Sequence, residues 1–294
     1  MLKKIVSLLI ICLLIMGASG CTGTKSPEKV PEDSLPSMSS HLISENQFAA
    51  TNSADETNRV SANNTPGTSN VSRAQAVPVL YYHSVMQETG NEVRMPPDQF
   101  DAQMAYLLAQ GYQCITLDQL YQTSAQEDIL PAKPFVITFD DGYLDNYTIA
   151  YPILKKYGFT ATIFMVSSYI NGEGFMSWSQ LRELDSNGWK IEGHTVNHPY
   201  LSKLDAVTML NELKSSKDFL EKGLGHTVNF FAYPYGDVND RVALAVKNSG
   251  YVMAFTTERG WADPRANAWH LQRVYCFASM GLNEFSRRIQ NSNY

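Results

Sequence analysis

From residue 77 onward, short apolar runs alternate with longer stretches in which apolar residues recur at helical spacing. The runs are continuously apolar, as in parallel strands that are covered by helices on both faces. They predict strands over 77–82, 112–116, 135–139, 160–166, 190–193, 228–232 and 251–256, with a weaker eighth at 270–276. The intervening stretches predict helices over 97–109, 148–157, 178–185, 205–221, 240–247 and 282–289.

This alternation predicts an α/β fold. Seven or eight β/α units within 218 residues favour a distorted (β/α) barrel of seven to eight parallel strands over an open sheet. Glycines follow several of the predicted helices, as expected of helix C-terminal caps. In such barrels the chemistry lies where strands end and loops begin.

The first 76 residues have a different pattern. Lys3 and Lys4 precede an apolar run over 5–16, which is too short to span a bilayer and typical of a signal peptide. Small residues then precede Cys21, as in a bacterial lipobox, so residues 1–20 are predicted to be a lipoprotein signal peptide. The alternative is an ordinary signal peptide with a chance cysteine. A lipidated Cys21 would anchor the protein to the membrane, outside the cytoplasm.

Residues 21–76 are predicted to be the lipidated cysteine and a disordered tether. Of the 55 residues from Thr22 to Ala76, 28 are Ser, Thr, Asn, Gly or Pro, which gives too little apolar surface to form a core. Residues 77–294 then form the single folded domain. Its two cysteines, Cys114 and Cys276, are expected to be free thiols, although they could pair.

Composition and charge limit the function classes. Hydrophobic residues make up 44% of the 294 residues, which excludes a collagen-like or wholly disordered chain. The net charge of −6, all of it in the predicted domain, argues against a nucleic-acid partner. We expect a monomer that binds no nucleic acid.

Polar residues gather directly after four of the predicted strands. His83 follows the first, Asp140-Asp141-Gly142 the third, His194 the fifth, and Tyr233-Pro234-Tyr235-Gly236 the sixth; His198 lies four residues after His194. Asp140-Asp141-Gly142 could be a plain turn, and a single histidine could be structural. The i, i+4 spacing of two histidines also suits one metal ion. All of these features together at one end of a barrel favour an active site.

These residues resemble two motifs of the polysaccharide deacetylases (the NodB-homology domain, carbohydrate esterase family 4). Thr138-Phe139-Asp140-Asp141-Gly142 resembles the first motif, and His194-Thr195-Val196-Asn197-His198 resembles the second. The resemblance covers the folded part of the chain. It implies that Asp141, His194 and His198 hold a divalent metal ion, usually zinc, and that Asp140 is the catalytic base. It also assigns an oxyanion-stabilising backbone N–H to the position of Tyr235.

The remaining catalytic assignments depart from the common family pattern. A leaving amine needs an acid, but the usual C-terminal Leu-x-His motif is absent, and Trp269-His270-Leu271 has the wrong order. His83 is our candidate for the acid and His270 the alternative. The His83 arrangement resembles the deacetylases of poly-β-1,6-N-acetylglucosamine, a biofilm exopolysaccharide.

The family pattern also bears on Tyr233 and Arg273, and two tryptophans are candidates for another reason, their residue type. Tyr233 stands where the common pattern has an arginine that orients the catalytic aspartate, and Arg273 is the candidate replacement; the alternative is a surface-paired arginine. Trp261 and Trp269 are candidates for stacking on a sugar, with core packing as the equal alternative.

The sequence therefore predicts a metal-dependent hydrolase that removes N-acetyl groups from an extracellular polysaccharide containing N-acetylglucosamine. Poly-β-1,6-N-acetylglucosamine is the favoured substrate; peptidoglycan, chitin oligosaccharides and acetylated xylan remain alternatives. A hypothesis from another class is an inactive glycan-binding lipoprotein.

Overall fold

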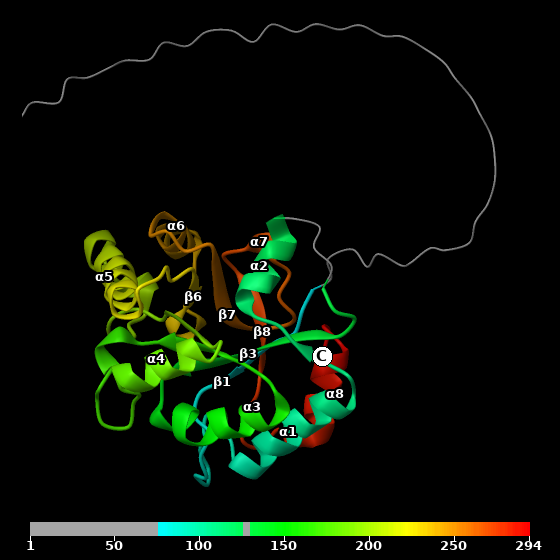
Figure 1. Cartoon of the computed structure of the whole chain (residues 1–294). Coiled ribbons are helices and arrows are strands. Elements are labelled where there is room, and N and C mark those ends of the chain that lie inside the picture. Colours follow the sequence, from blue (N-terminus) through cyan, green and yellow to red (C-terminus); the bar gives the residue numbers. More distant parts are fainter. Residues whose placement is uncertain (1–75, 126–129) are drawn as a thin grey trace, which may run out of the picture. The chain divides into compact units, whose positions relative to one another are not determined.

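The computed structural model describes residues 76–125 and 130–294 (Figure 1). The predicted signal peptide, Cys21 and almost the whole predicted tether lie outside these described residues. Within the described residues, no helix combines the length and the apolar composition needed to cross a bilayer. Cys114 and Cys276 are free thiols.

All eight predicted strands are present. They are β1 (Val79–Tyr82), β2 (Gln113–Cys114), β3 (Pro134–Asp141), β4 (Thr162–Met165), β5 (Lys190–Gly193), β6 (Phe230–Ala232), β7 (Met253–Arg259) and β8 (Leu271–Tyr275).

The strands form a closed parallel barrel. The sheet order is β1-β8-β7-β6-β5-β4-β3, and β3 pairs again with β1, so seven strands close the ring. The second strand pairs with β3 at its N-terminal end, through Gln113 and Cys114, and stays outside this ring. The prediction of a distorted (β/α) barrel is therefore confirmed, with seven strands in the barrel and one extra.

Helices cover the barrel. The α-helices are α1 (Pro97–Ala109), α2 (Leu117–Ala125), α3 (Tyr151–Tyr157), α4 (Trp178–Ser186), α5 (Ala206–Leu224), α6 (Asp240–Asn248), α7 (Pro264–Asn267) and α8 (Gly281–Gln290). One-turn helices precede or follow them: η1 (Asn146–Ala150), η2 (Ser167–Tyr169), η3 (Leu201–Lys203) and η4 (Pro234–Gly236). The α1 helix packs against α3 and α8, and α5 packs against α6 (Figure 1).

The six predicted helices are present, but α2 and α7 were not predicted. The start of α2 has a capping box, which the sequence indicates by a threonine, Thr116, followed three residues later by Gln119. The Gln119 N–H donates to Thr116 Oγ1, and the Thr116 N–H donates to Gln119 Oε1. The four-residue α7 is too short for its apolar period to be recognised.

Alternation along β3 decides which of its side chains lie inside the barrel. Val136 belongs to a core cluster in which most of the buried residues lie on strands, whereas Ile137 and Phe139 belong to the cluster that contains most of the buried helix residues. Since the side-chain period of a strand is two, Thr138 and Asp140 lie on the same side as Val136. Asp140 thus reaches the inside of the barrel at the carboxyl end of β3.

Candidate active site

The polar residues that follow the strands line one cavity of about 410 Å³. It lies at the carboxyl ends of β1, β3, β5 and β6, the end of a barrel where enzymes carry their active sites. Six of the residues predicted from the sequence line it: His83, Asp140, Asp141, His194, His198 and Tyr235.

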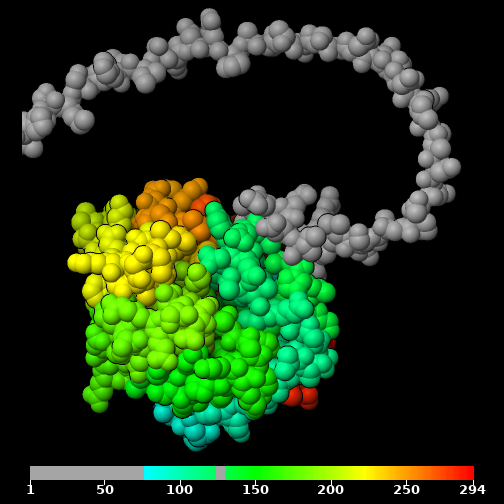
Figure 2. All heavy atoms as spheres, viewed as in Figure 1, coloured from blue at the N-terminus to red at the C-terminus, as the bar shows by residue number. Residues whose placement is uncertain are grey.

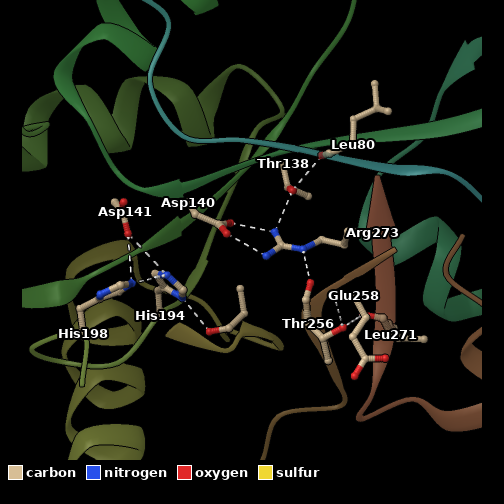
Figure 3. A network of polar contacts seen from close by, with 11 residues as sticks. Leu80, Thr138, Asp140, Asp141, His194, His198, Thr256, Glu258, Leu271 and Arg273 are labelled. Carbon is tan, nitrogen blue, oxygen red and sulfur yellow. Dashed lines mark hydrogen bonds and ion pairs between the residues drawn. The ribbon is translucent and has the colours of Figure 1, made fainter. Parts of the chain in front are cut away.

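Asp141, His194 and His198 converge on one point of this cavity (Figure 3). Asp141 Oδ1 lies 3.5 Å from His194 Nε2 and 3.3 Å from His198 Nε2, and the two Nε2 atoms are 3.1 Å apart. One carboxylate oxygen and two imidazole nitrogens form the donor set of many catalytic zinc sites, in which a further position stays open.

The protonation of these groups suits metal binding. His194 Nδ1 lies 2.6 Å from the carbonyl oxygen of Ala232, so it carries the proton and leaves the Nε2 lone pair free. Burial, together with His194, lowers the pKa of His198 to about 4, which keeps this imidazole neutral. Burial alone would raise the pKa of Asp141, but the neighbouring histidines hold it at about 2. Asp141 Oδ1 is buried without a hydrogen-bond partner among the described residues, as expected of an oxygen that serves as a metal ligand.

Left-handed backbone conformations direct these ligands. Asp141, Thr195 and His198 have φ values of 75°, 68° and 58°, which are uncommon for residues other than glycine. Gly142 follows with a φ of 88°, and a Cβ atom there would lie 2.1 Å from the sulfur of Met165. A side chain at this position would be strained by the positive φ and would have to displace the side chain of Met165, which explains why the third residue of the Asp-Asp-Gly motif is glycine.

Glu212 of α5 holds the loop between the two histidines. Its Oε2 accepts hydrogen bonds from the N–H groups of Val196 and Asn197, each at 2.9 Å. Thr195 Oγ1 accepts a further bond from the N–H of His198. This carboxylate was not singled out from the sequence, because a glutamate on an amphipathic helix gives no local indication that it caps a distant loop.

Asp140 is paired with Arg273 inside the barrel (Figure 3). Arg273 Nη1 and Nη2 donate to the two carboxylate oxygens at 2.8 and 2.7 Å, while Nε donates to the carbonyl oxygen of Thr256. Burial opposes ionisation of Asp140, but the guanidinium lowers the pKa of this carboxyl below its usual value. Arg273 has no exposed surface, so the alternative of a surface-paired arginine is wrong.

His83 enters the cavity from the end of β1. Its Nδ1 is buried and has no hydrogen-bond partner among the described residues. Burial lowers its pKa, although Asp140 and Asp141 act in the opposite direction. The adjoining chain is fixed from η1 and its N-cap: Asp145 accepts bonds from Ser84 and from the N–H of Val85, and Asn146 donates to the carbonyl oxygen of His83.

Three other candidates lie elsewhere. His270, the alternative acid, lies outside the cavity lining and pairs with Glu258 at 2.9 Å. Trp261 lines a hollow with Pro78 and Pro134, at the opposite ends of β1 and β3, and its indole N–H donates to the carbonyl oxygen of Arg288. Trp269 packs against the core beneath Lys247. For both tryptophans the structure supports core packing rather than contact with a sugar in this cavity.

Aromatic side chains that the sequence analysis did not select form much of the cavity wall. Tyr143, Tyr169 and Phe175 line it on one side. Burial and the Asp141 carboxylate raise the pKa of Tyr143 to about 12, so its hydroxyl remains a hydrogen-bond donor. Its place directly after the Asp-Asp-Gly motif could have indicated it.

On another side of the cavity, Tyr235 contacts two rings. Its ring stacks on Tyr200 at 4.1 Å and contacts His198 edge to face at 4.5 Å. Tyr235 nevertheless remains 53% exposed at the cavity, and its contact with His198 helps to fix the orientation of that imidazole. Tyr233, at the position of the missing arginine, is buried and donates to the carbonyl oxygen of Trp269.

Comparisons with known proteins agree with this geometry. A family model described as polysaccharide deacetylase matches residues 127–254. A Bacillus subtilis protein named "Putative polysaccharide deacetylase YxkH" is 35% identical over 215 residues, which are 73% of this chain and 76% of that protein. A Staphylococcus aureus poly-beta-1,6-N-acetyl-D-glucosamine N-deacetylase is 29% identical over 210 residues, 66% of this chain and 71% of its own length.

Solved structures include a similar fold. The Streptococcus pyogenes deacetylase PplD, determined in complex with acetate, matches with a TM-score of 0.70 and 28% identity, over 74% of this chain and 99% of PplD. The chain therefore belongs to the polysaccharide deacetylase family (carbohydrate esterase family 4) and is a hydrolase of that family.

Proposed function

We propose that this chain is a metal-dependent hydrolase that removes N-acetyl groups from a polysaccharide containing N-acetylglucosamine, with poly-β-1,6-N-acetylglucosamine as the favoured substrate. The observation that carries the proposal is that three potential metal ligands, the Arg273-paired Asp140 and His83, whose Nδ1 has no hydrogen-bond partner among the described residues, share one cavity. Zinc is the favoured ion, since two imidazoles and a carboxylate suit it.

Asp141, His194 and His198 would hold the ion. When bound, a divalent cation supplies a Lewis acid that polarises a carbonyl group and lowers the pKa of water. Asp140 is the candidate base: Arg273 keeps it ionised at neutral pH and fixes its orientation through two hydrogen bonds. An ionised carboxylate held in this way can take the proton of the attacking water.

His83 is the candidate acid for the leaving nitrogen. Its lowered pKa means that it is neutral at rest, and the carboxylates of Asp140 and Asp141 favour its charged form as it takes up a proton. It can then pass this proton to the amine, which leaves poorly as an anion. The backbone N–H of Tyr235 is the candidate donor to the developing oxyanion, as the family resemblance implies.

Two features support poly-β-1,6-N-acetylglucosamine as the substrate. The Staphylococcus aureus relative is named for poly-beta-1,6-N-acetyl-D-glucosamine, and its similarity extends over 66% of this chain. In addition, the histidine in the cavity comes from β1 rather than from the C-terminal part of the chain, which is the arrangement that resembles this subgroup.

The test measures acetate release by the full chain, purified in detergent, on a panel of glycans. The panel holds poly-β-1,6-N-acetylglucosamine, peptidoglycan, chitin oligosaccharides and acetylated xylan, each assayed with zinc and after chelation. We expect the highest rate on the first glycan, dependence on metal, and no comparable rate for Asp140→Asn. An inactive glycan-binding protein would bind a glycan without releasing acetate from any of them. Wild-type rates for Asp140→Asn would refute the assignment of the base.

We also propose that the protein acts outside the cytoplasm, anchored to the membrane through lipidated Cys21. The support is the apolar run at residues 5–16 followed by Ala18-Ser19-Gly20-Cys21. Labelled fatty acid should be incorporated into the wild-type chain and not into Cys21→Ala. Equal labelling of the two chains would contradict the proposal.

A further inference from the structure

A second hollow adjoins the catalytic cavity. It has a volume of about 450 Å³, close to the 410 Å³ of the cavity, and both lie in the range of pockets that bind small ligands. Tyr143 and Phe175 line both spaces, so the two are neighbours across these rings. Chain from between β1 and α1 contributes Met86 and Arg94, and the cyan atoms of this segment form the lower edge of the molecule in Figure 2.

The wall between the two spaces is a stack of rings. Tyr143 and Phe175 stack at 5.2 Å with 22° between their planes, and Tyr169 contacts Phe175 at 4.4 Å. The Arg94 guanidinium lies 4.6 Å from the centre of the Tyr143 ring. Each ring is held by a neighbour, so the wall is a fixed element between the cavity and the hollow.

The lining of the hollow combines apolar residues with a net negative charge, since it holds Arg94 against Asp145 and Glu173. Met86, Leu144 and Ile149 supply apolar surface. The positive charge of Arg94 is compensated, since its Nε lies 3.3 Å from Glu88 and its Nη1 3.5 Å from Asp145.

Glu173 is the remaining charge in this lining. It is exposed and has no hydrogen-bond or ion-pair partner among the described residues. Its carboxylate is therefore available to a cation that enters the hollow. A glycan extending out of the catalytic cavity would bring its next sugar to this place, and a sugar from which the acetyl group has been removed carries an ammonium group.

We propose that this hollow, which we call the Glu173 groove, binds the sugar unit next to the one being deacetylated, and that it favours a unit with a free amine. The proposal rests on the proposed function. The position of the groove, directly across the Tyr143 and Phe175 rings from the cavity, indicates the occupant, and the carboxylate of Glu173 selects the amine by charge complementarity. The enzyme then acts preferentially beside units that it has already deacetylated.

The test compares defined β-1,6-linked pentasaccharides. One is fully acetylated, and the others carry a single glucosamine on one or the other side of the central acetylated unit. For the wild-type full chain, kcat/KM for acetate release should be about two- to five-fold higher on one of the two glucosamine isomers, the size expected of an exposed ion pair. This preference should decline at high salt.

Three variants and a control locate the effect. Glu173→Gln should abolish the preference, and Glu173→Lys should reverse it. Thr148→Trp, at an exposed position of the lining, should lower kcat/KM on all pentasaccharides while hydrolysis of a small aryl acetate, which needs only the catalytic cavity, stays at the wild-type rate. Asp218→Asn removes an exposed carboxylate on α5 that lines neither space, and should change none of these values.

The outcomes separate the two proposals. Absence of acetate release by the wild type from every glycan refutes the proposed function. Acetate release with equal rates on all three pentasaccharides, or a preference that Glu173→Gln retains, refutes the Glu173 groove alone. A binding preference for the fully acetylated pentasaccharide would show that the groove takes an acetylated unit, which also overturns the inference.

Discussion

Replacement of Arg273 by methionine tests whether this arginine keeps Asp140 ionised inside the barrel. Methionine keeps a long unbranched stem in the core but removes the guanidinium, which donates to both oxygens of Asp140 and to the carbonyl oxygen of Thr256. Asp140 is only 3% exposed, so bulk water would compensate little of this loss. Breaking a buried ion pair on one side costs about 3–5 kcal/mol, and we expect the free energy of unfolding at pH 7 to fall by this amount.

The loss should depend on pH with a definite sign. In the wild type the lowered pKa of Asp140 stabilises the fold above the pKa of the unfolded chain, and this contribution declines as the pH falls. In Arg273→Met, burial without a partner raises the pKa of Asp140, so the variant becomes less stable as the pH rises. The difference between the two proteins should therefore be smaller at pH 5 than at pH 7.5.

The assay is urea unfolding at both pH values, with chelator present so that metal content is equal. Asp140→Asn combined with Arg273→Met removes the stranded charge and leaves one buried amide, which costs about 1–3 kcal/mol. The double variant should thus be more stable than Arg273→Met alone. A loss below about 1 kcal/mol, or an equal loss with and without Asp140→Asn, would refute the reasoning.

Three further predictions follow from the same geometry. His83→Ala should lower kcat on the order of 10²-fold, whereas His270→Ala should keep wild-type activity; the reverse result would reassign the acid. His198→Ala should lose stoichiometric zinc, measured by elemental analysis, while Asp218→Asn retains it; an unchanged zinc content would reject the ligand set. Burial raises the pKa of Glu192 on β5 to about 8. Its protonated form is therefore the one that stabilises the fold, and wild-type stability should decline between about pH 4.5 and 8. Glu192→Gln should lack this decline when the free energy of unfolding in urea is measured across this pH range. An equal dependence of that free energy on pH in both proteins would contradict the prediction.

Most of the fold could be predicted from the sequence because its cause is local. Continuous apolar runs specify strands that are buried on both faces, and amphipathic stretches between them specify helices. The family motifs lie on contiguous residues at the ends of single strands, so Asp140, Asp141, His194 and His198 could be selected without knowledge of the packing. The position of β2 could not, since a two-residue strand that pairs only with β3 looks like any other apolar run.

The rest of the site depends on barrel closure. Arg273 and Asp140 are 133 residues apart and meet because β8 and β3 both pair with β1. The same closure places His83 in the cavity and leaves His270 outside it, and it places Trp261 at the opposite end of the barrel. The sequence by itself determined which strands and motif residues exist, because neighbouring residues set them. Only the tertiary structure decided which distant side chains share the cavity, because strand register and ring closure are properties of the whole sheet.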